Sequence, residues 1–413
     1  MTEKLTSRKS INFLVLLCAA VYFVSYFTRI NYAAVLVEII DSEGYSKVEA
    51  SAPLTGLFIS YGFGQILSGW LSDKYKSEII LFAGLLLTAA MNGLIPLCGS
   101  VILISAVWFV NGFAQALIWP PIVRILTAYL TVKDYQEKIF IISWSSSVGT
   151  VAVYIFAPFI IKRCGWRPVF FISASLAAVT AVIWLAAINR IRKKAAVSVQ
   201  KEYCQESQRY SSLIKDGRAV FIVVLTLAVI AVHGILRDGI SSWMPTYISE
   251  TYSVENTVSI ISSIGLPVFS MAATWLSSYI NKKFIRNEAA CSAFWFICSI
   301  IFNSILYSAY DLSPVLSIAM LTAVYGCSNG INLMFTCTVI PYFRKYGKVS
   351  FFTGLFNSAT YVGSAVSMYA AAGITTRFGW KGAVLMWLAA GLCGAALSLA
   401  MVKPLQSFKR NSL

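Results

Sequence analysis

The sequence predicts an all-α membrane protein with twelve transmembrane helices in two six-helix bundles. Of its 413 residues, 58% are hydrophobic and 12% are charged, and the mean hydropathy is +0.73. Soluble domains carry about 25% charged residues, so a soluble fold of this length would expose much apolar surface to water. The apolar runs are continuous and reach the ~20 residues that a spanning helix needs. Strands of membrane barrels are shorter and alternate in polarity, which excludes a barrel.

Twelve apolar stretches are candidate spanning helices: 11–39, 47–72, 78–98, 101–129, 137–161, 168–188, 219–248, 256–280, 288–309, 314–342, 350–373 and 382–402. The longest connection, 189–218, is polar and basic and leaves six candidates on either side. We therefore predict an N-terminal bundle over 1–188, a cytoplasmic linker over 189–218 and a C-terminal bundle over 219–413. Apolar run 11–39 is too long for the core of a signal peptide.

The distribution of basic residues predicts the orientation. If both termini are cytoplasmic, 24 of the 33 lysines and arginines lie in inner segments and 6 in outer loops, as the positive-inside rule requires. This also accounts for the formal charge of +16 without a nucleic-acid partner. We expect a monomeric, multi-pass protein of a bacterial inner (plasma) membrane, whose partners are the lipid bilayer and a small anionic substrate.

Two short motifs recur at equivalent places in the two halves. Gly165-Trp166-Arg167 precedes the sixth span, and Gly379-Trp380-Lys381 precedes the twelfth. Likewise Gly69-Trp70-Leu71-Ser72-Asp73 ends the second span, and Thr274-Trp275-Leu276-Ser277-Ser278 ends the eighth. Parallel repeats of this kind are typical of secondary transporters, whose substrate site lies between the halves near the membrane midplane.

No sequence pattern indicates an enzyme, a metal site or a cofactor. The nine cysteines are scattered without CxxC spacing, and His233 is the only histidine. Cysteines in apolar runs behave as small hydrophobic residues. We expect no catalytic residues, no metal and no cofactor.

The loop after the second span resembles a family signature. Gly69-Trp70-Leu71-Ser72-Asp73-Lys74-Tyr75-Lys76 is similar to the loop 2–3 motif of the major facilitator superfamily. A narrower resemblance is to its organophosphate:phosphate antiporters, which include glycerol-3-phosphate and hexose-phosphate transporters. The stretches that carry it are Tyr22…Tyr26…Arg29-Ile30-Asn31-Tyr32-Ala33, Tyr61-Gly62-Phe63-Gly64, Gly112-Phe113-Ala114-Gln115, Trp119-Pro120-Pro121…Arg124, Arg237-Asp238-Gly239…Trp243-Met244-Pro245-Thr246-Tyr247 and Phe352-Thr353-Gly354-Leu355-Phe356.

This resemblance implies exchange of an organic phosphate for inorganic phosphate by alternating access, with Arg29 and Arg237 holding the phosphate. It also directs attention to two departures. Gln65 stands where the family often carries a lysine, and Trp144 is followed by serines where the family carries a histidine. We include Gln65 and Trp144 among the candidate binding residues.

Arg29 and Arg237 are the principal candidates for binding an anion. An arginine at the centre of a spanning helix costs about 2.5–3.5 kcal/mol on insertion scales. Two guanidinium groups facing each other can hold one oxyanion with bidentate hydrogen bonds. The alternative is snorkelling, because the 19–20 residues that separate each arginine from the basic residue before its span rise ~29 Å, enough to reach the outer headgroups.

Four further residues are candidates for the substrate site. Tyr22 and Tyr26 are spaced to share a helical face with Arg29, where they either donate hydrogen bonds to a substrate or pack. His233 lies one turn before Arg237 and serves either in proton-linked transport or as a wall residue. Tyr361 is a candidate for lining the cavity from the second half.

The remaining charged residues are better candidates for gating. Asp73, with its neighbour Lys74, ends the second span. Arg124 lies near the inner end of the fourth span, where it snorkels or pairs. Asp238 is the one acidic residue well inside a predicted span, and the scarcity of buried acids favours exchange over proton symport, since proton symport often uses a buried carboxylate.

We therefore expect a secondary transporter of a small organic anion, with organophosphate:phosphate exchange as the first hypothesis. One alternative is an organic anion:proton symporter, for example for a sugar acid. Another is a transporter-like membrane sensor of a phosphorylated metabolite.

Overall fold

The computed structural model describes residues 5, 7–194, 217–340, 342–343 and 349–410. Ten helical stretches among them are long and apolar enough to cross a membrane. The last of these contains two helices that meet at Gly379, and Lys47–Lys74 is a further long helix. The described residues thus form twelve membrane-length segments, which confirms the predicted fold class.

The first six segments follow the predicted order. Their helices are α1 (Arg8–Glu43), α2 (Lys47–Lys74), α3 (Ser77–Leu94) with the short η1 (Ile95–Leu97), α4 (Val101–Ala116), α5 (Trp119–Tyr129), α6 (Val132–Cys164) and α7 (Arg167–Lys194). The fourth segment is broken between α4 and α5 because Pro120 and Pro121 stand at the start of α5, where proline is tolerated but cannot continue a preceding helix.

The second six segments are also interrupted in places. Their helices are α8 (Gly217–Tyr252), α9 (Asn256–Ser262), α10 (Gly265–Ile280) with the π-helical η2 (Asn281–Ile285), α11 (Glu288–Ser308), α12 (Pro314–Leu333) with the π-helical η3 (Met334–Thr338), and α13 (Val349–Arg410), which changes direction at Gly379. Most of the predicted linker, 195–216, lies outside the described residues, and the division into domains at 189–218 stays a prediction.

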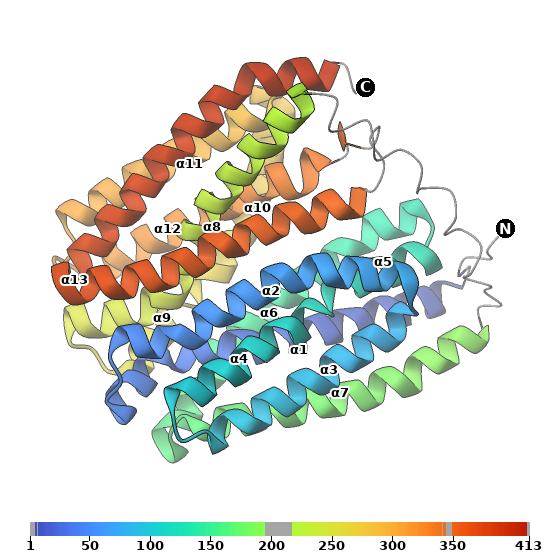
Figure 1. Cartoon of the computed structure of the whole chain (residues 1–413), viewed down its shortest axis with the longest axis horizontal. Coiled ribbons are helices and arrows are strands. Elements are labelled where there is room, and N and C mark those ends of the chain that lie inside the picture. Colours follow the sequence, from blue (N-terminus) through green and yellow to red (C-terminus); the bar gives the residue numbers. More distant parts are fainter. Residues whose placement is uncertain (1–4, 6, 195–216, 341, 344–348, 411–413) are drawn as a thin grey trace.

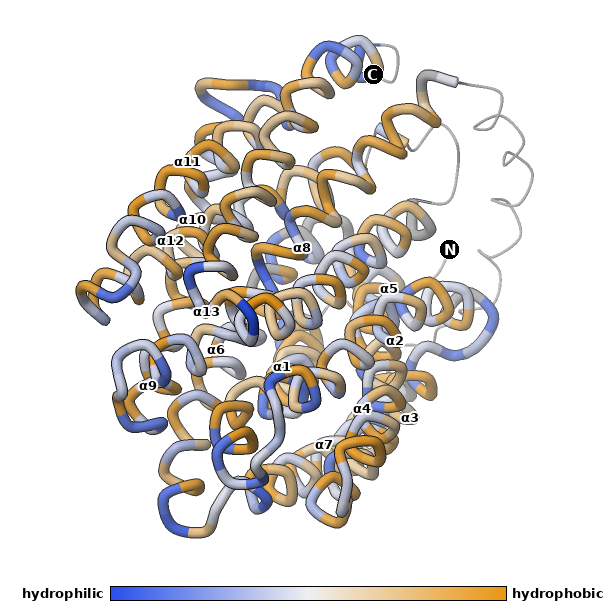
Figure 2. The backbone as a smooth tube through the Cα atoms, turned by 60° about the vertical axis from the view of Figure 1, so that its left-hand side comes forward, coloured by the Kyte–Doolittle hydropathy of each residue, from blue (hydrophilic) through white to orange (hydrophobic). Residues whose placement is uncertain are grey.

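The helices of the two halves lie side by side and run in alternating directions. Figure 1 shows α1–α7 on one side of the molecule and α8–α13 on the other, with the start of α1 and the end of α13 at the same end. We call this the terminal end, and we call the end that holds Glu43 and Tyr252 the far end. In Figure 2 hydrophilic segments gather at the helix ends and turns, while the helix bodies are largely hydrophobic.

The predicted Gly-Trp repeat forms the same turn in both halves. Gly165 (φ 73°, ψ −175°) and Gly379 (φ 67°, ψ −174°) share one backbone conformation, which glycine adopts without the strain that a side chain brings. The indole of Trp166 then donates to Glu43 (3.1 Å), and that of Trp380 donates to Glu250 (2.8 Å). Each tryptophan thereby ties the last helix of its half to the far end of the first.

Buried polar contacts fix the rotation of α1. Asn31 donates to Asn92 (2.8 Å) and Ser173 (2.9 Å), and Gln115 joins Ser25 (2.7 Å) and Thr28 (2.9 Å). These bonds hold one face of α1 against α3, α4 and α7. Tyr22, Tyr26 and Arg29 lie on another face of α1, where Arg29 and Tyr22 contact Tyr61 on α2 and Trp119 on α5.

Close helix packing fixes α8 in the same way. A Cβ atom on Gly234 would overlap the backbone oxygen of Thr360, and one on Gly363 would overlap that of Ala231. Glycine permits this approach between α8 and the first part of α13, as small residues do in membrane helix pairs. The contact sets the position of Arg237 relative to α13.

Candidate functional site

Arg29 lies inside the helix bundle among tyrosine rings. Its side chain is 7% exposed, so it does not extend to the headgroups as snorkelling would require. The guanidinium carbon lies 4.1 Å from the ring centre of Tyr26 and 4.8 Å from that of Tyr61. Both contacts are within the ~6 Å range of cation–π attraction. Among the described residues, no carboxylate lies within ion-pair distance of Arg29.

Arg237 is paired with its neighbour in the sequence. Its Nε donates to Oδ1 of Asp238 (2.8 Å) and its Nη2 to Oδ2 (2.6 Å), a bidentate pair in which each side chain is 15% exposed. The hydroxyl of Ser364 also donates to Oδ2 of Asp238 (2.5 Å). The guanidinium carbon of Arg237 lies 5.5 Å from the ring centre of Tyr361.

Tyr361 brings the two arginines into one site. Its ring packs edge-on against Tyr61 at 4.4 Å between centres, and its phenol interacts electrostatically with both Arg29 and Arg237. Tyr26 also interacts with both charges. We call Arg29, Tyr26, Tyr61, Tyr361, Arg237 and Asp238 the central cluster. It joins α1 and α2 of the first half to α8 and α13 of the second, so the two predicted arginines do face a shared region.

Three further predicted residues lie on the same helices as members of this cluster: Tyr22 on α1, Gln65 on α2 and His233 on α8. Tyr22 stacks on Trp119 (4.6 Å between ring centres) and its hydroxyl lies 3.5 Å from that of Tyr26. Gln65 is 3% exposed, and its amide nitrogen has no hydrogen-bond partner among the described residues. His233 is fully buried one turn before Arg237, and both ring nitrogens lack such partners. Their roles in binding stay predictions.

The other predicted residues are not part of the central cluster. Trp144 on α6 is 56% exposed. Arg124 is half-buried on α5, and Lys74 lies at the end of α2 with its ammonium 3.9 Å from the ring centre of Trp70. Asp73 belongs to α2, but its side chain lies outside the described residues. The gating roles of Asp73, Lys74 and Arg124 stay predictions, whereas Asp238 lies within the cluster as the partner of Arg237.

Three contributors were not among the predicted site residues. Tyr61 occurs in the Tyr-Gly-Phe-Gly run of the family resemblance, which was the available signal. Ser364 lies on α13 one turn after Thr360, whose carbonyl it also contacts (2.9 Å). Tyr325 on α12 interacts electrostatically with Arg237, Asp238 and Tyr26. Neither Ser364 nor Tyr325 belongs to a recognisable motif.

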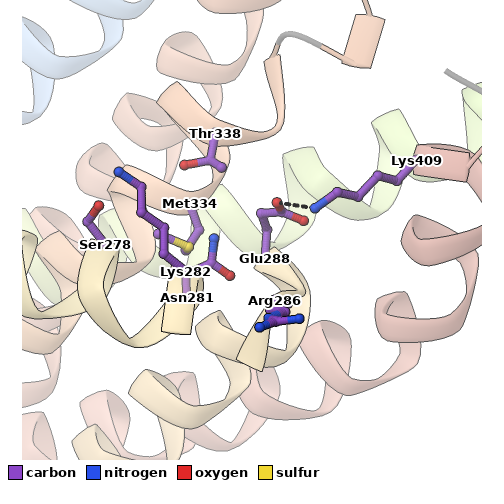
Figure 3. A pocket seen from close by; sticks show the side chains of 8 residues that line it. All are labelled: Ser278, Asn281, Lys282, Arg286, Glu288, Met334, Thr338 and Lys409. Atoms are coloured by element: carbon purple, nitrogen blue, oxygen red, sulfur yellow. Dashed lines mark hydrogen bonds and ion pairs between the residues drawn. The ribbon is translucent and has the colours of Figure 1, made fainter. Parts of the chain in front are cut away.

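A hollow with a volume of about 290 Å³ lies at the terminal end of the C-terminal half, away from the central cluster (Figure 3). Its acidic member, Glu288, is 2% exposed and accepts hydrogen bonds from Tyr342 (2.6 Å) and Lys409 (2.9 Å). The first half has a matching contact, from Tyr129 to Glu78 (3.0 Å). This repeated pairing at the start of the third segment of each half ties helix ends together. The residues that line the hollow are Ser278, Asn281, Lys282, Arg286, Glu288, Met334, Thr338 and Lys409.

Twelve membrane-length segments with buried, charged residues where the two halves meet are typical of membrane transporters. The family model of the Major Facilitator Superfamily matches residues 18–343, and the chain belongs to this family.

Relatives of known description cover most of the chain. It is 23% identical over 390 residues to the glycerol-3-phosphate transporter of Bacillus subtilis, covering 87% of this chain and 85% of the relative. It is 24% identical over 413 residues to a probable hexose phosphate transport protein of Chlamydia pneumoniae (93% and 88%), and 23% identical over 399 residues to the membrane sensor protein UhpC of Escherichia coli (91% and 89%).

Solved structures share the fold at low identity. A POT family transporter in complex with 5-aminolevulinic acid superimposes with a TM-score of 0.75 at 11% identity, over 95% of this chain and 96% of that one. A bacterial homologue of the human lysosomal transporter Spinster, in an inward-facing and unoccupied conformation, gives 0.74 at 12% identity over 98% of each chain. These likenesses support the helix arrangement.

Proposed function

We propose that this protein is a secondary transporter that moves a small phosphorylated organic anion across the bacterial inner membrane in exchange for inorganic phosphate. The observation that carries the proposal is that Arg29 and Arg237, from opposite halves, reach one group of tyrosine rings. Arg29 lies 4.8 Å from the ring centre of Tyr61, Tyr61 packs on Tyr361 at 4.4 Å, and Arg237 lies 5.5 Å from the ring centre of Tyr361. Guanidinium groups bind phosphate and carboxylate oxygens in pairs. The names of the glycerol-3-phosphate and hexose-phosphate relatives support a phosphorylated substrate.

The geometry also supports alternating access. Both ion pairs that join the halves within the described residues lie at the far end: Lys47–Glu250 (2.6 Å) and Lys162–Glu255 (3.7 Å). Asn256 adds hydrogen bonds to Glu38 (3.0 Å) and Asp41 (2.9 Å). With the termini in the cytoplasm, as the basic residues predict, this state is closed toward the outside. Rocking of one half against the other would break these contacts and open the central cluster outward.

Counterflow in proteoliposomes tests the proposal. Vesicles loaded with unlabelled phosphate should accumulate labelled phosphate, glycerol 3-phosphate or hexose 6-phosphate, and should not accumulate hexuronates. Arg29→Lys and Arg237→Lys should abolish uptake while leaving expression intact, because an ammonium is a point charge that lacks the planar pair of donors. Wild-type uptake rates in either variant would contradict the two-arginine site.

Two specific observations favour alternative functions, which the following measurements would identify. Asp238 is a buried carboxylate inside a span, which favours an organic anion:proton symporter; uptake that collapses with a protonophore and shows no counterflow with phosphate would identify one. The relative described as a membrane sensor favours a sensor; ligand binding without transport in vesicles would identify that function.

A further inference from the structure

We propose that Asp238 is a built-in counter-ion that makes the central cluster selective for singly charged anions. The inference rests on the proposed function, because it concerns the charge of the substrate that the same cluster accepts. It assigns Asp238 a role in substrate selection.

The contacts of Asp238 hold it on Arg237. Two donors of the guanidinium, on Nε and Nη2, are engaged by its carboxylate, and Ser364 fixes the same carboxylate from α13. Because the two residues are neighbours on α8, the pair moves as a unit when the halves rock. Asp238 occupies the edge of the guanidinium formed by Nε and Nη2. The other edge, formed by Nη1 and the second N–H of Nη2, offers a second bidentate face. A substrate therefore binds Arg237 without displacing Asp238.

The charged side chains of the central cluster, Arg29, Arg237 and Asp238, give it a net charge of +1. Arg29 is a cation with no carboxylate within ion-pair distance among the described residues, whereas the charge of Arg237 is cancelled by Asp238. The other polar groups that face the pair are His233 on α8, Tyr26 on α1, Tyr325 on α12, and Tyr361 and Ser364 on α13. Tyrosine and serine hydroxyls are uncharged near neutral pH. His233 has no hydrogen-bond partner among the described residues to stabilise a second cation beside Arg237.

A net charge of one distinguishes substrates by their own charge. A singly charged anion makes the occupied cluster neutral. A doubly charged anion leaves one uncompensated negative charge in a buried site, which is costly in a region of low dielectric. The cluster should therefore prefer the singly charged form of a phosphate ester, or a monoanion of the same shape.

A pair of isosteric probes separates charge from shape. Glucose 6-phosphate is a dianion at pH 8, since the second pKa of a phosphate monoester is about 6, whereas glucose 6-sulfate is a monoanion with the same tetrahedral group of oxygens. Their dissociation constants are measured by calorimetry at pH 8 on the purified full-length protein. We expect wild type to bind the sulfate ester at least as tightly as the phosphate ester.

Variants at position 238 then test the assigned residue. Asp238→Asn keeps the shape but leaves the charge of Arg237 uncancelled, so the affinity ratio should shift at least tenfold toward the phosphate ester. Asp238→Glu keeps the charge and should keep the wild-type ratio. Asp311→Asn removes an exposed carboxylate elsewhere and serves as the matched control.

Each outcome decides one of the two proposals. Binding of both esters with an unchanged ratio in Asp238→Asn overturns the counter-ion role and leaves the proposed function standing. If wild type binds neither ester, both the proposed function and the counter-ion role are overturned. If Asp238→Asn fails to fold, wild type decides alone: tenfold tighter binding of the phosphate ester overturns the inference.

Discussion

Lys47 at the start of α2 and Glu250 near the end of α8 form an ion pair of 2.6 Å between the two halves of the molecule. The side chains are 19% and 34% exposed, and the ammonium of Lys47 also lies 5.0 Å from the ring centre of Trp380. A half-buried pair is screened less than one on the surface. The pair therefore favours the state in which the far end is closed.

Breaking this ion pair should shift the protein toward the state that is open at the far end. We expect Lys47→Met to raise the open population about fivefold. This corresponds to the loss of roughly 1 kcal/mol, which is the upper end of what an exposed ion pair contributes. Spin labels on cysteines introduced at Ser42 and Val258, in a background without the native cysteines, report the separation of the halves.

The matched control is Lys162→Met. Lys162 and Glu255 are 70% and 60% exposed and lie 3.7 Å apart, so this change should leave the distance distribution nearly unchanged. Equal shifts in the two variants would contradict the closing role of Lys47. Restoration of the closed population by the charge-exchanged pair Lys47→Glu with Glu250→Lys would support it.

Gly363 should tolerate no side chain. The added methyl group of Gly363→Ala would overlap the backbone oxygen of Ala231 on α8. Because the nearest atoms all belong to the backbone, the overlap can be relieved only by displacing one helix from the other. Overpacking typically costs about 1–3 kcal/mol, and here it also shifts α8, which carries Arg237. Thermal unfolding in detergent should show a lower midpoint, with weaker substrate binding in the fraction that remains folded.

A second glycine of α13 provides the comparison for this test. Nothing lies within 4 Å of the Cβ position of Gly373, so Gly373→Ala should leave the unfolding midpoint unchanged or raise it. If Gly363→Ala is as stable as Gly373→Ala, the close packing of α8 on α13 is not required.

The fold could be predicted from the sequence because membrane helices are recognisable by their length and hydropathy. The repeated Gly-Trp motif was also readable, since Gly165 and Gly379 are needed for one backbone conformation. The breaks at Ser263 and at the π-helical turns after Ile280 and Leu333 were missed. These breaks depend on packing between neighbouring helices, which hydropathy does not encode.

The candidate site was predictable only in part. Arg29 and Arg237 stand out because arginine is costly inside a span, and the spacing of Tyr26 from Arg29 placed both on one face. The pairing of Arg237 with Asp238 was not foreseen, because adjacent residues on a helix do not face each other and only long side chains that bend toward one another make the contact. Ser364 and Tyr325 carry no charge and were indistinguishable from other polar residues in apolar runs.

Glu288 should stabilise the terminal end of the second half through its charge. In Glu288→Gln the side chain still accepts from Tyr342, but Lys409 loses its anionic partner. Hydrogen bonds to charged groups contribute about 1.5–3 kcal/mol, so the unfolding midpoint should fall. Glu78→Gln in the first half is the control, because Glu78 accepts from the neutral Tyr129 and the amide oxygen replaces it. Equal midpoints for the two variants would contradict a role for the charge.

Trp380 and Trp166 should differ in function although their hydrogen bonds match. The glutamate that Trp166 contacts pairs with Arg167 of the same half (2.9 Å), whereas the glutamate that Trp380 contacts pairs with Lys47 of the other half. Trp380→Phe removes a donor that positions Glu250, so it should raise the open population at the far end two- to threefold in the spin-label experiment. Trp166→Phe should leave that population unchanged, because the contacts it weakens lie within one half and move with it. A shift of equal size in Trp166→Phe would show that the aromatic packing, and not the bond to Glu250, holds the far end closed.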